Sequence, residues 1–168
     1  FISYFSCYTA VKLGKIKMIV GSTKENLSLE KRVSLTPETA KNIIGLGLQV
    51  ILEKNYATHL GILDQENENS GVKIKNTSNE VISSCNLLIK VNCPSQEDIS
   101  SLKEKTIIVG MMNPSKNKKE LIEINKKKVD IFSLETLPRI TRAQSMDVLS
   151  SQSNLAGYRA VVDCVAEF

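Results

Sequence analysis

The stretch Leu87–Val109, LLIKVNCPSQEDISSLKEKTIIV, indicates how this chain of 168 residues is expected to fold. It contains two short apolar runs, Leu87–Val91 and Thr106–Val109, separated by a more polar stretch that predicts a helix over Gln96–Leu102. Short apolar runs joined by helices are typical of strands buried on both faces of a parallel sheet. The segment therefore predicts a strand–helix–strand unit of an α/β protein.

The same alternation of short apolar runs and longer mixed stretches continues on both sides of this unit. Thr36, Pro37 and Glu38 indicate a helix start, because threonine caps a helix, proline suits its first position and an acid suits its first turn. We expect this helix to stop at Gly45 or Gly47. Further strands are expected at Ile16–Val20, Gln49–Leu52, Val72–Lys75 and Val129–Phe132, and further helices at Asn79–Ser84, Lys118–Asn125, Ser145–Leu149 and from Leu155 onward.

The charge balance argues against a nucleic-acid-binding protein. The chain has 22 Lys and Arg residues against 18 Asp and Glu, a net charge of +4, and its basic residues are scattered except in Lys116–Lys128. A nucleic-acid-binding surface usually has a denser basic face. We interpret Lys116–Lys128 as the solvated face of the expected helix and its flanks, with a phosphate-binding patch as the less favoured alternative.

The residue inventory limits the chemistry further. The four cysteines share no C-x2-C spacing and His59 is the only histidine, so we expect no metal site. A hydrolase would have to use His59, which no nucleophile motif accompanies. We expect His59 to be a partly buried structural residue and Cys93 to be unreactive. No apolar run approaches the roughly 20 residues that span a bilayer.

Both ends of the sequence are expected to be cut from a longer protein. The chain begins at Phe1, and residues 1–17 have three lysines and no acid, which fits either a targeting leader or an extra strand or extension. The helical pattern that reaches Phe168 has no stop signal. Neither G-x-G-x-x-G nor G-x4-G-K-[ST] occurs, so any dinucleotide-binding fold would lie outside these residues.

Three polar loops follow expected strands, at the edge where open α/β sheets bind ligands. The first runs from Lys24 to Pro37, the second from Lys90 to Pro94, and the third from Leu134 to Ser150. These loops are the candidate ligand-binding segments.

The loops carry recognisable motifs: KE at 24–25, EKRVSLTPET at 30–39, LLIKVNCP at 87–94 and LPRITRAQSMDVLSSQSNLAGYRAVVDCVAEF at 137–168. Together they closely resemble the start of the alpha subunit of the proton-translocating NAD(P) transhydrogenases, which are related to alanine dehydrogenases. The K-R-V-x-L-T-P box alone would be shared with alanine dehydrogenases. The long run after Leu137 is far more specific, and the resemblance covers Met18 to Phe168.

The resemblance implies a three-layer α/β fold related to the catalytic domains of formate and glycerate dehydrogenases. It implies an N-terminal domain at 18–153, within an NAD(H)-binding region, and a helix from 154 to 168 that leads to a separate Rossmann domain. The implied enzyme transfers hydride between NADH and NADP+ while protons cross a membrane. NADP would bind a separate component, and the partners would be NADP(H)-binding and membrane-spanning components, with homodimer pairing. The implied place is a peripheral domain of a membrane complex, on the bacterial cytoplasmic side or at an organellar inner membrane.

The resemblance also implies site residues. Arg139, Gln144 and Asp147 match the family's mobile loop beside the nicotinamide, as catalytic and NAD-binding residues, and Ser150 lies one helical turn beyond. If the stretch is helical, Gln144, Asp147 and Ser150 lie three apart on one ridge. Hydride transfer needs position and electrostatics rather than a general base. Without the resemblance, Asp147 would be interpreted as a helix cap or ion-pair partner, and Ser150 with Ser151 as the next helix cap.

Two other functions stay open at this point. In alanine dehydrogenases, residues at the positions of Arg32 and Lys90 hold the substrate, and a histidine follows the next strand. Here that loop contains Asn113 and no histidine, which argues against amino-acid dehydrogenation. Arg32 would otherwise form a surface salt bridge with Glu30 or Glu38, and Lys90 would extend from a strand end to solvent. The second alternative is a non-catalytic dimerisation or docking module.

Overall fold

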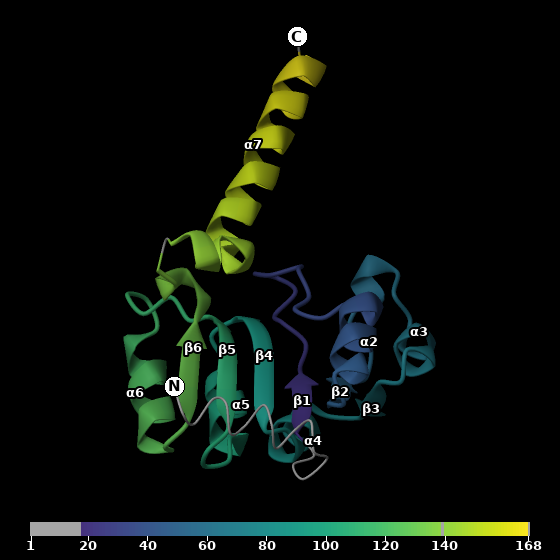
Figure 1. The fold of residues 1–168 in the computed structure, drawn as a ribbon, viewed down its shortest axis with the longest axis vertical. Helices are drawn as coiled ribbons and strands as arrows, with labels where there is room; N and C mark the ends of the chain where they lie inside the picture. The colour runs from purple at the N-terminus through teal and green to yellow at the C-terminus, as the bar shows by residue number, and fades with distance from the viewer. Residues whose placement is uncertain (1–17, 139, 168) are drawn as a thin grey trace.

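The computed structural model describes residues 18–138 and 140–167, which form one parallel sheet flanked by helices (Figure 1). The strands are β1 (Ile19–Ser22), β2 (Gln49–Glu53), β3 (Lys73–Lys75), β4 (Leu87–Asn92), β5 (Ile107–Met111) and β6 (Asp130–Ser133). Their order is β3-β2-β1-β4-β5-β6, and neighbouring strands are parallel. Every expected strand is present, which confirms the α/β class; Ile16 and Lys17 of the first lie outside the described residues.

Helices cover both faces of the sheet. Along β2, Val50 and Leu52 pack in one apolar cluster and Ile51 in the other, because successive strand residues face opposite ways. The first cluster lies beneath α2 (Pro37–Gly45) and α3 (Asp64–Asn69), and the second beneath α4 (Ser78–Ser84), α5 (Gln96–Ser101) and α6 (Lys118–Lys126). The expected three-layer arrangement is therefore confirmed.

The first helix begins as its sequence predicts. The Thr36 side chain accepts a hydrogen bond from the backbone N–H of Thr39, the Thr39 hydroxyl accepts one from the backbone N–H of Thr36, and Pro37 occupies the first turn. The helix ends at Gly45, and Gly47 follows with a φ of 87°, a conformation that glycine adopts without strain.

The end of the chain differs from its expectation. A 3-10 helix, η3 (Thr141–Met146), is followed by one long helix, α7 (Val148–Glu167), which rises from the carboxyl edge of the sheet (Figure 1). The expected helix over Ser145–Leu149 and the expected helix start near Asn154 are both wrong. The chain breaks at Asp147, whose ψ of 90° is not helical. Within the described residues, no helix is long and apolar enough to cross a membrane.

Tyr56 holds the loop after β1 against this edge. Its buried hydroxyl accepts hydrogen bonds from the backbone N–H groups of Ser34 and Leu35, at 3.0 and 3.2 Å, and lies 2.8 Å from the Ser22 hydroxyl. We expect Tyr56→Phe to lower the free energy of unfolding by about 1–3 kcal/mol, because two N–H donors lose their acceptor. Urea unfolding checks this, with the exposed Tyr158→Phe as a control that should change nothing.

Candidate functional site

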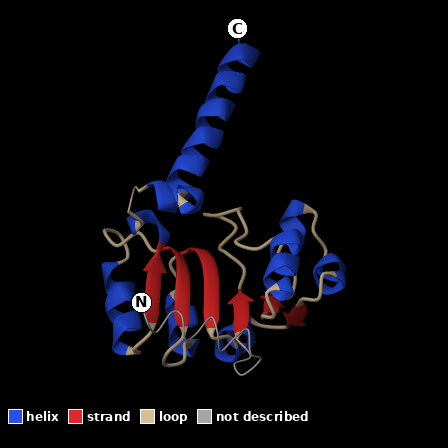
Figure 2. Cartoon of the chain, in the orientation of Figure 1, coloured by secondary structure: helices blue, strands red, loops and turns tan. Residues whose placement is uncertain are grey.

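A pocket of about 380 Å³ lies at the junction between η3 and α7. Its apolar wall consists of Leu137, Pro138, Ile140 and Ala143, and its polar side consists of Gln144, Asp147 and Ser150. The pocket follows the carboxyl end of β6, and Figure 2 shows the loops at the same edge of the red strands as α7. Parallel sheets bind ligands at this edge.

Three of the four predicted site residues lie together in this pocket. Gln144 comes from η3, Asp147 from the break between helices, and Ser150 from the first turn of α7. Arg139 lies outside the described residues, so its position stays a prediction. The expected helical ridge is wrong, since the bend at Asp147 is what brings the three side chains to one pocket.

Asp147 is the N-cap of α7. Its Oδ1 accepts hydrogen bonds from the backbone N–H groups of Leu149 and Ser150, both at 3.0 Å, and its Oδ2 accepts one from the Ser150 hydroxyl at 2.6 Å. A capping carboxylate satisfies donors that the first helical turn leaves unpaired. The capping interpretation of Asp147 is therefore confirmed. Ser150 and Ser151 lie inside the helix, so the interpretation of both as its cap is wrong.

The Gln144 side chain is the available polar group in this pocket. It is exposed, and among the described residues its carboxamide makes no hydrogen bond. A free carboxamide can donate through its nitrogen and accept through its oxygen. Beside the apolar wall of Pro138 and Ile140, this arrangement fits a flat ring that carries an amide group.

A second pocket, of about 470 Å³, lies where the loops after β1, β4 and β5 diverge. β1 and β4 are neighbours in the sheet, and the chain turns away from them in opposite directions, as at other ligand-binding switch points. Lys90 lies here, but its side chain is 5% exposed and its ammonium is 2.9 Å from the Asp98 carboxylate. The expectation that Lys90 reaches solvent is wrong, because a buried acid pairs with it.

Arg32 is also paired. Its Nε and Nη2 donate hydrogen bonds to the two carboxylate oxygens of Glu30, at 2.9 and 2.6 Å, which confirms the expected salt bridge. The hydrogen bonds from Arg32 lower the pKa of Glu30 to about 2. Its Nη1 donates a third bond to the Gln152 side chain on α7, at 3.0 Å. Both cations that could hold a carboxylate substrate therefore already have acidic partners.

The loop after β5 offers no acid–base residue. Asn113 stands where an alanine dehydrogenase has histidine, and its backbone N–H donates to the Glu135 carboxylate, as does that of Met112. His59 is exposed rather than partly buried, and its Nε2 lies 2.7 Å from the Lys31 carbonyl oxygen.

Burial raises the pKa of the Cys93 thiol to about 11, which agrees with its expected lack of reactivity. The described residues contain no cluster of histidine, cysteine and acidic side chains that could hold a metal ion.

Sequence reasoning missed two partners that shape this edge, Asp98 and Gln152. Asp98 had a signal in Ser95-x-x-Asp98, a capping pattern that places an acid at the start of α5 beside the end of β4. Gln152 had none, because it meets Arg32 across 120 positions of sequence. The third helix, α3, was also missed, since its residues DQENEN have no apolar periodicity.

The doubly covered parallel sheet, with a site built from loops at its carboxyl edge, defines an α/β domain of the dehydrogenase type. A family model described as "Alanine dehydrogenase/PNT, N-terminal domain" matches residues 21–156, and the chain belongs to this family. The family resemblance expected from the motifs is confirmed. The family consists of oxidoreductases.

Individual relatives agree. The chain is 39% identical over 150 residues to the first of the proteins that make up the NAD(P) transhydrogenase alpha subunit of Rickettsia prowazekii, covering 87% of this chain and 39% of that protein. The crystal structure of a transhydrogenase from Sinorhizobium meliloti is similar with a TM-score of 0.82 and 37% identity, over 89% of this chain and 45% of that one. Alanine dehydrogenase 1 of Staphylococcus aureus is more distant, at 29% identity over 86% of this chain and 38% of that protein. The chain thus spans about two fifths of the length of these curated relatives.

Proposed function

We propose that this chain is the N-terminal domain of the NAD(H)-binding component of a proton-translocating NAD(P) transhydrogenase. The observation that carries the proposal is the free Gln144 carboxamide in an apolar pocket beside the capping carboxylate of Asp147. The identity to transhydrogenase alpha subunits supports it. The NADP(H)-binding and membrane-spanning components, a second copy of the chain, and a peripheral place on the membrane belong to the same proposal.

The pocket residues fit the nicotinamide end of NAD(H). When bound, the nicotinamide would supply the hydride donor or acceptor. The Gln144 carboxamide can donate to and accept from the ring's own carboxamide, which fixes the ring face that is offered. Pro138 and Ile140 form an apolar wall that limits water at the ring. Arg139 would direct a planar set of donors to a pyrophosphate or carboxylate oxygen.

Asp147 and Ser150 have a positional role in this proposal. The Ser150 hydroxyl donates to Asp147, so both side chains are held in one orientation before a ligand arrives. A preorganised site loses less entropy when the reacting groups are brought together. No residue has to move a proton in hydride transfer, which agrees with Asn113 in place of a histidine.

The rival activity, amino-acid dehydrogenation, is disfavoured by the pairing of Arg32 with Glu30 and of Lys90 with Asp98. A 2-oxo acid would have to displace these partners, and desolvated charges that lose a partner are costly.

The test is an activity measurement on the complete protein with its membrane components. We expect NADH to reduce an NADP+ analogue, and we expect pyruvate with ammonium to cause no NADH oxidation. Pyruvate-dependent oxidation without transhydrogenation would favour the alanine dehydrogenase alternative. A folded protein with neither activity and no NADH binding would favour the docking module.

A further inference from the structure

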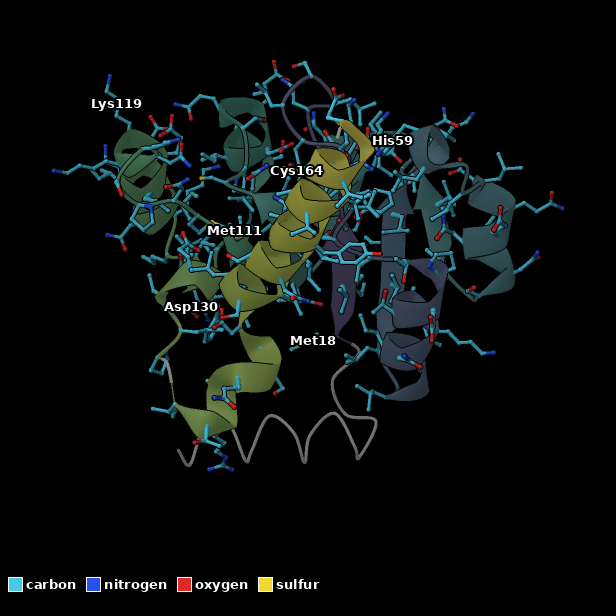
Figure 3. All side chains as sticks on the ribbon, turned by 90° about the horizontal axis from the view of Figure 1, so that it is seen from above. Met18, His59, Met111, Lys119, Asp130 and Cys164 are labelled. Atoms are coloured by element: carbon cyan, nitrogen blue, oxygen red, sulfur yellow. The ribbon has the colours of Figure 1, made fainter. Side chains whose placement is uncertain are left out.

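The direction of α7 is not fixed by buried apolar packing within the described residues. None of its described residues is buried, and its apolar side chains Leu155, Tyr158, Val161 and Val165 are 60%, 74%, 63% and 72% exposed. The helix rises away from the sheet in Figure 1, and Figure 3 shows it from above, with Cys164 labelled on it. Contacts near its first turns must therefore orient it.

One side-chain hydrogen bond joins α7 to the sheet layer across the described residues. Nη1 of Arg32 donates to Oε1 of Gln152 at 3.0 Å. Arg32 belongs to the loop between β1 and α2, whereas Gln152 lies in the second turn of α7, close to Asp147 and Ser150. The contact thus connects the first polar loop with the part of the helix that carries the site residues.

The guanidinium of Arg32 is itself held rigidly. Glu30 accepts from its Nε and Nη2 and also from its backbone N–H at 2.9 Å. Two parallel bonds between a guanidinium and a carboxylate fix the plane of both groups. Glu30 is in turn anchored to the sheet, because its Oε2 accepts from the Asn92 side chain at the end of β4, at 3.3 Å. Since the pKa of Glu30 is lowered to about 2, its carboxylate stays ionised at neutral pH.

A polar chain therefore runs from β4 through Asn92, Glu30 and Arg32 to Gln152 on α7. We infer that Arg32 is a positioning residue that, by holding Gln152, sets the angle at which α7 leaves the sheet and so places Asp147 and Ser150 at the pocket. The kinetic consequence rests on the proposed function, whereas the geometric one does not. It also gives Arg32 a role in this chain other than holding a substrate carboxylate.

The geometric test measures the direction of α7 in the complete protein. Spin labels are placed at Cys164 on α7 and at Lys119→Cys on α6, both exposed and both labelled in Figure 3, with other accessible cysteines replaced by serine. We expect Arg32→Met and Gln152→Leu each to shift or broaden the distance distribution. Lys31→Met, which removes a neighbouring exposed charge, and Gln152→Glu, which keeps an acceptor for Arg32, should leave it unchanged.

The kinetic test uses the same variants. We expect Arg32→Met and Gln152→Leu to lower kcat for hydride transfer about tenfold while KM for NADH changes by less than about twofold, because geometry rather than affinity is lost. An unchanged label distance in both variants overturns the inference. So does a pyruvate-dependent activity whose KM rises in Arg32→Met alone. A shifted distance in a protein without transhydrogenation would support the positioning role and reject the proposed function.

Discussion

Replacing Gln144 by asparagine in the complete protein is expected to slow hydride transfer about 100-fold, with little change in KM for NADH. The shorter side chain keeps the amide chemistry but withdraws the carboxamide by about 1 Å, and a misplacement of that size is enough to disturb an aligned reaction. Stopped-flow measurement of hydride transfer, with NADH binding measured separately, distinguishes the two effects.

Asp147→Asn should act in the same direction for a different reason. An asparagine still offers an Oδ1 acceptor to the backbone N–H groups of Leu149 and Ser150, so α7 keeps its cap while the negative charge is lost. A slower transfer rate with unchanged helix content would therefore assign the effect to charge at the pocket.

Gln96→Asn is the matched control for Gln144, because Gln96 is an exposed glutamine in the first turn of α5, away from the pocket. It should leave the transfer rate unchanged. An unchanged rate in Gln144→Asn and Asp147→Asn would remove both residues from the site. A raised KM at constant kcat in Gln144→Asn would instead make Gln144 an affinity contact.

The sheet could be predicted from the sequence because each strand has its own local signal. Leu87–Val91 and Thr106–Val109 are short apolar runs flanked by polar residues, and burial of both sheet faces selects this pattern. Thr36 and Pro37 likewise define a helix start through contacts within one turn. Signals of this kind survive folding because they do not depend on a distant partner.

The site was harder to predict because its geometry depends on one residue and on distant contacts. A three-residue spacing suggested that Gln144, Asp147 and Ser150 share a helix face, yet Asp147 ends η3 and caps α7. Capping and helical continuation are both open to an aspartate in a polar stretch, and only the tertiary structure decides between them. The contact of Arg32 with Gln152 had no local signal at all.

The largest expected stability effect concerns the ion pair between Lys90 and Asp98. The two side chains are 5% and 9% exposed, and Nζ of Lys90 is 2.9 Å from Oδ2 of Asp98. Asp98→Ala should lower the free energy of unfolding by about 3–5 kcal/mol, because it leaves a buried ammonium without its counter-charge. Urea unfolding of the complete protein measures the loss, and Glu104→Ala is the control. Glu104 pairs with Lys128 at 3.8 Å on the exposed surface, so its loss should cost about 0–1 kcal/mol.

The double variant Lys90→Met with Asp98→Leu tests the cause. Removing both charges removes the desolvation cost along with the attraction, so much of the lost stability should return. If Asp98→Ala costs no more than Glu104→Ala, the Lys90 ammonium is compensated by another group, such as the Lys24 carbonyl oxygen 3.4 Å away. A double variant that is stable and still transfers hydride would show that Lys90 is a structural residue in this chain. A stable double variant that has lost hydride transfer would instead make the charge at the switch-point pocket a requirement of the reaction.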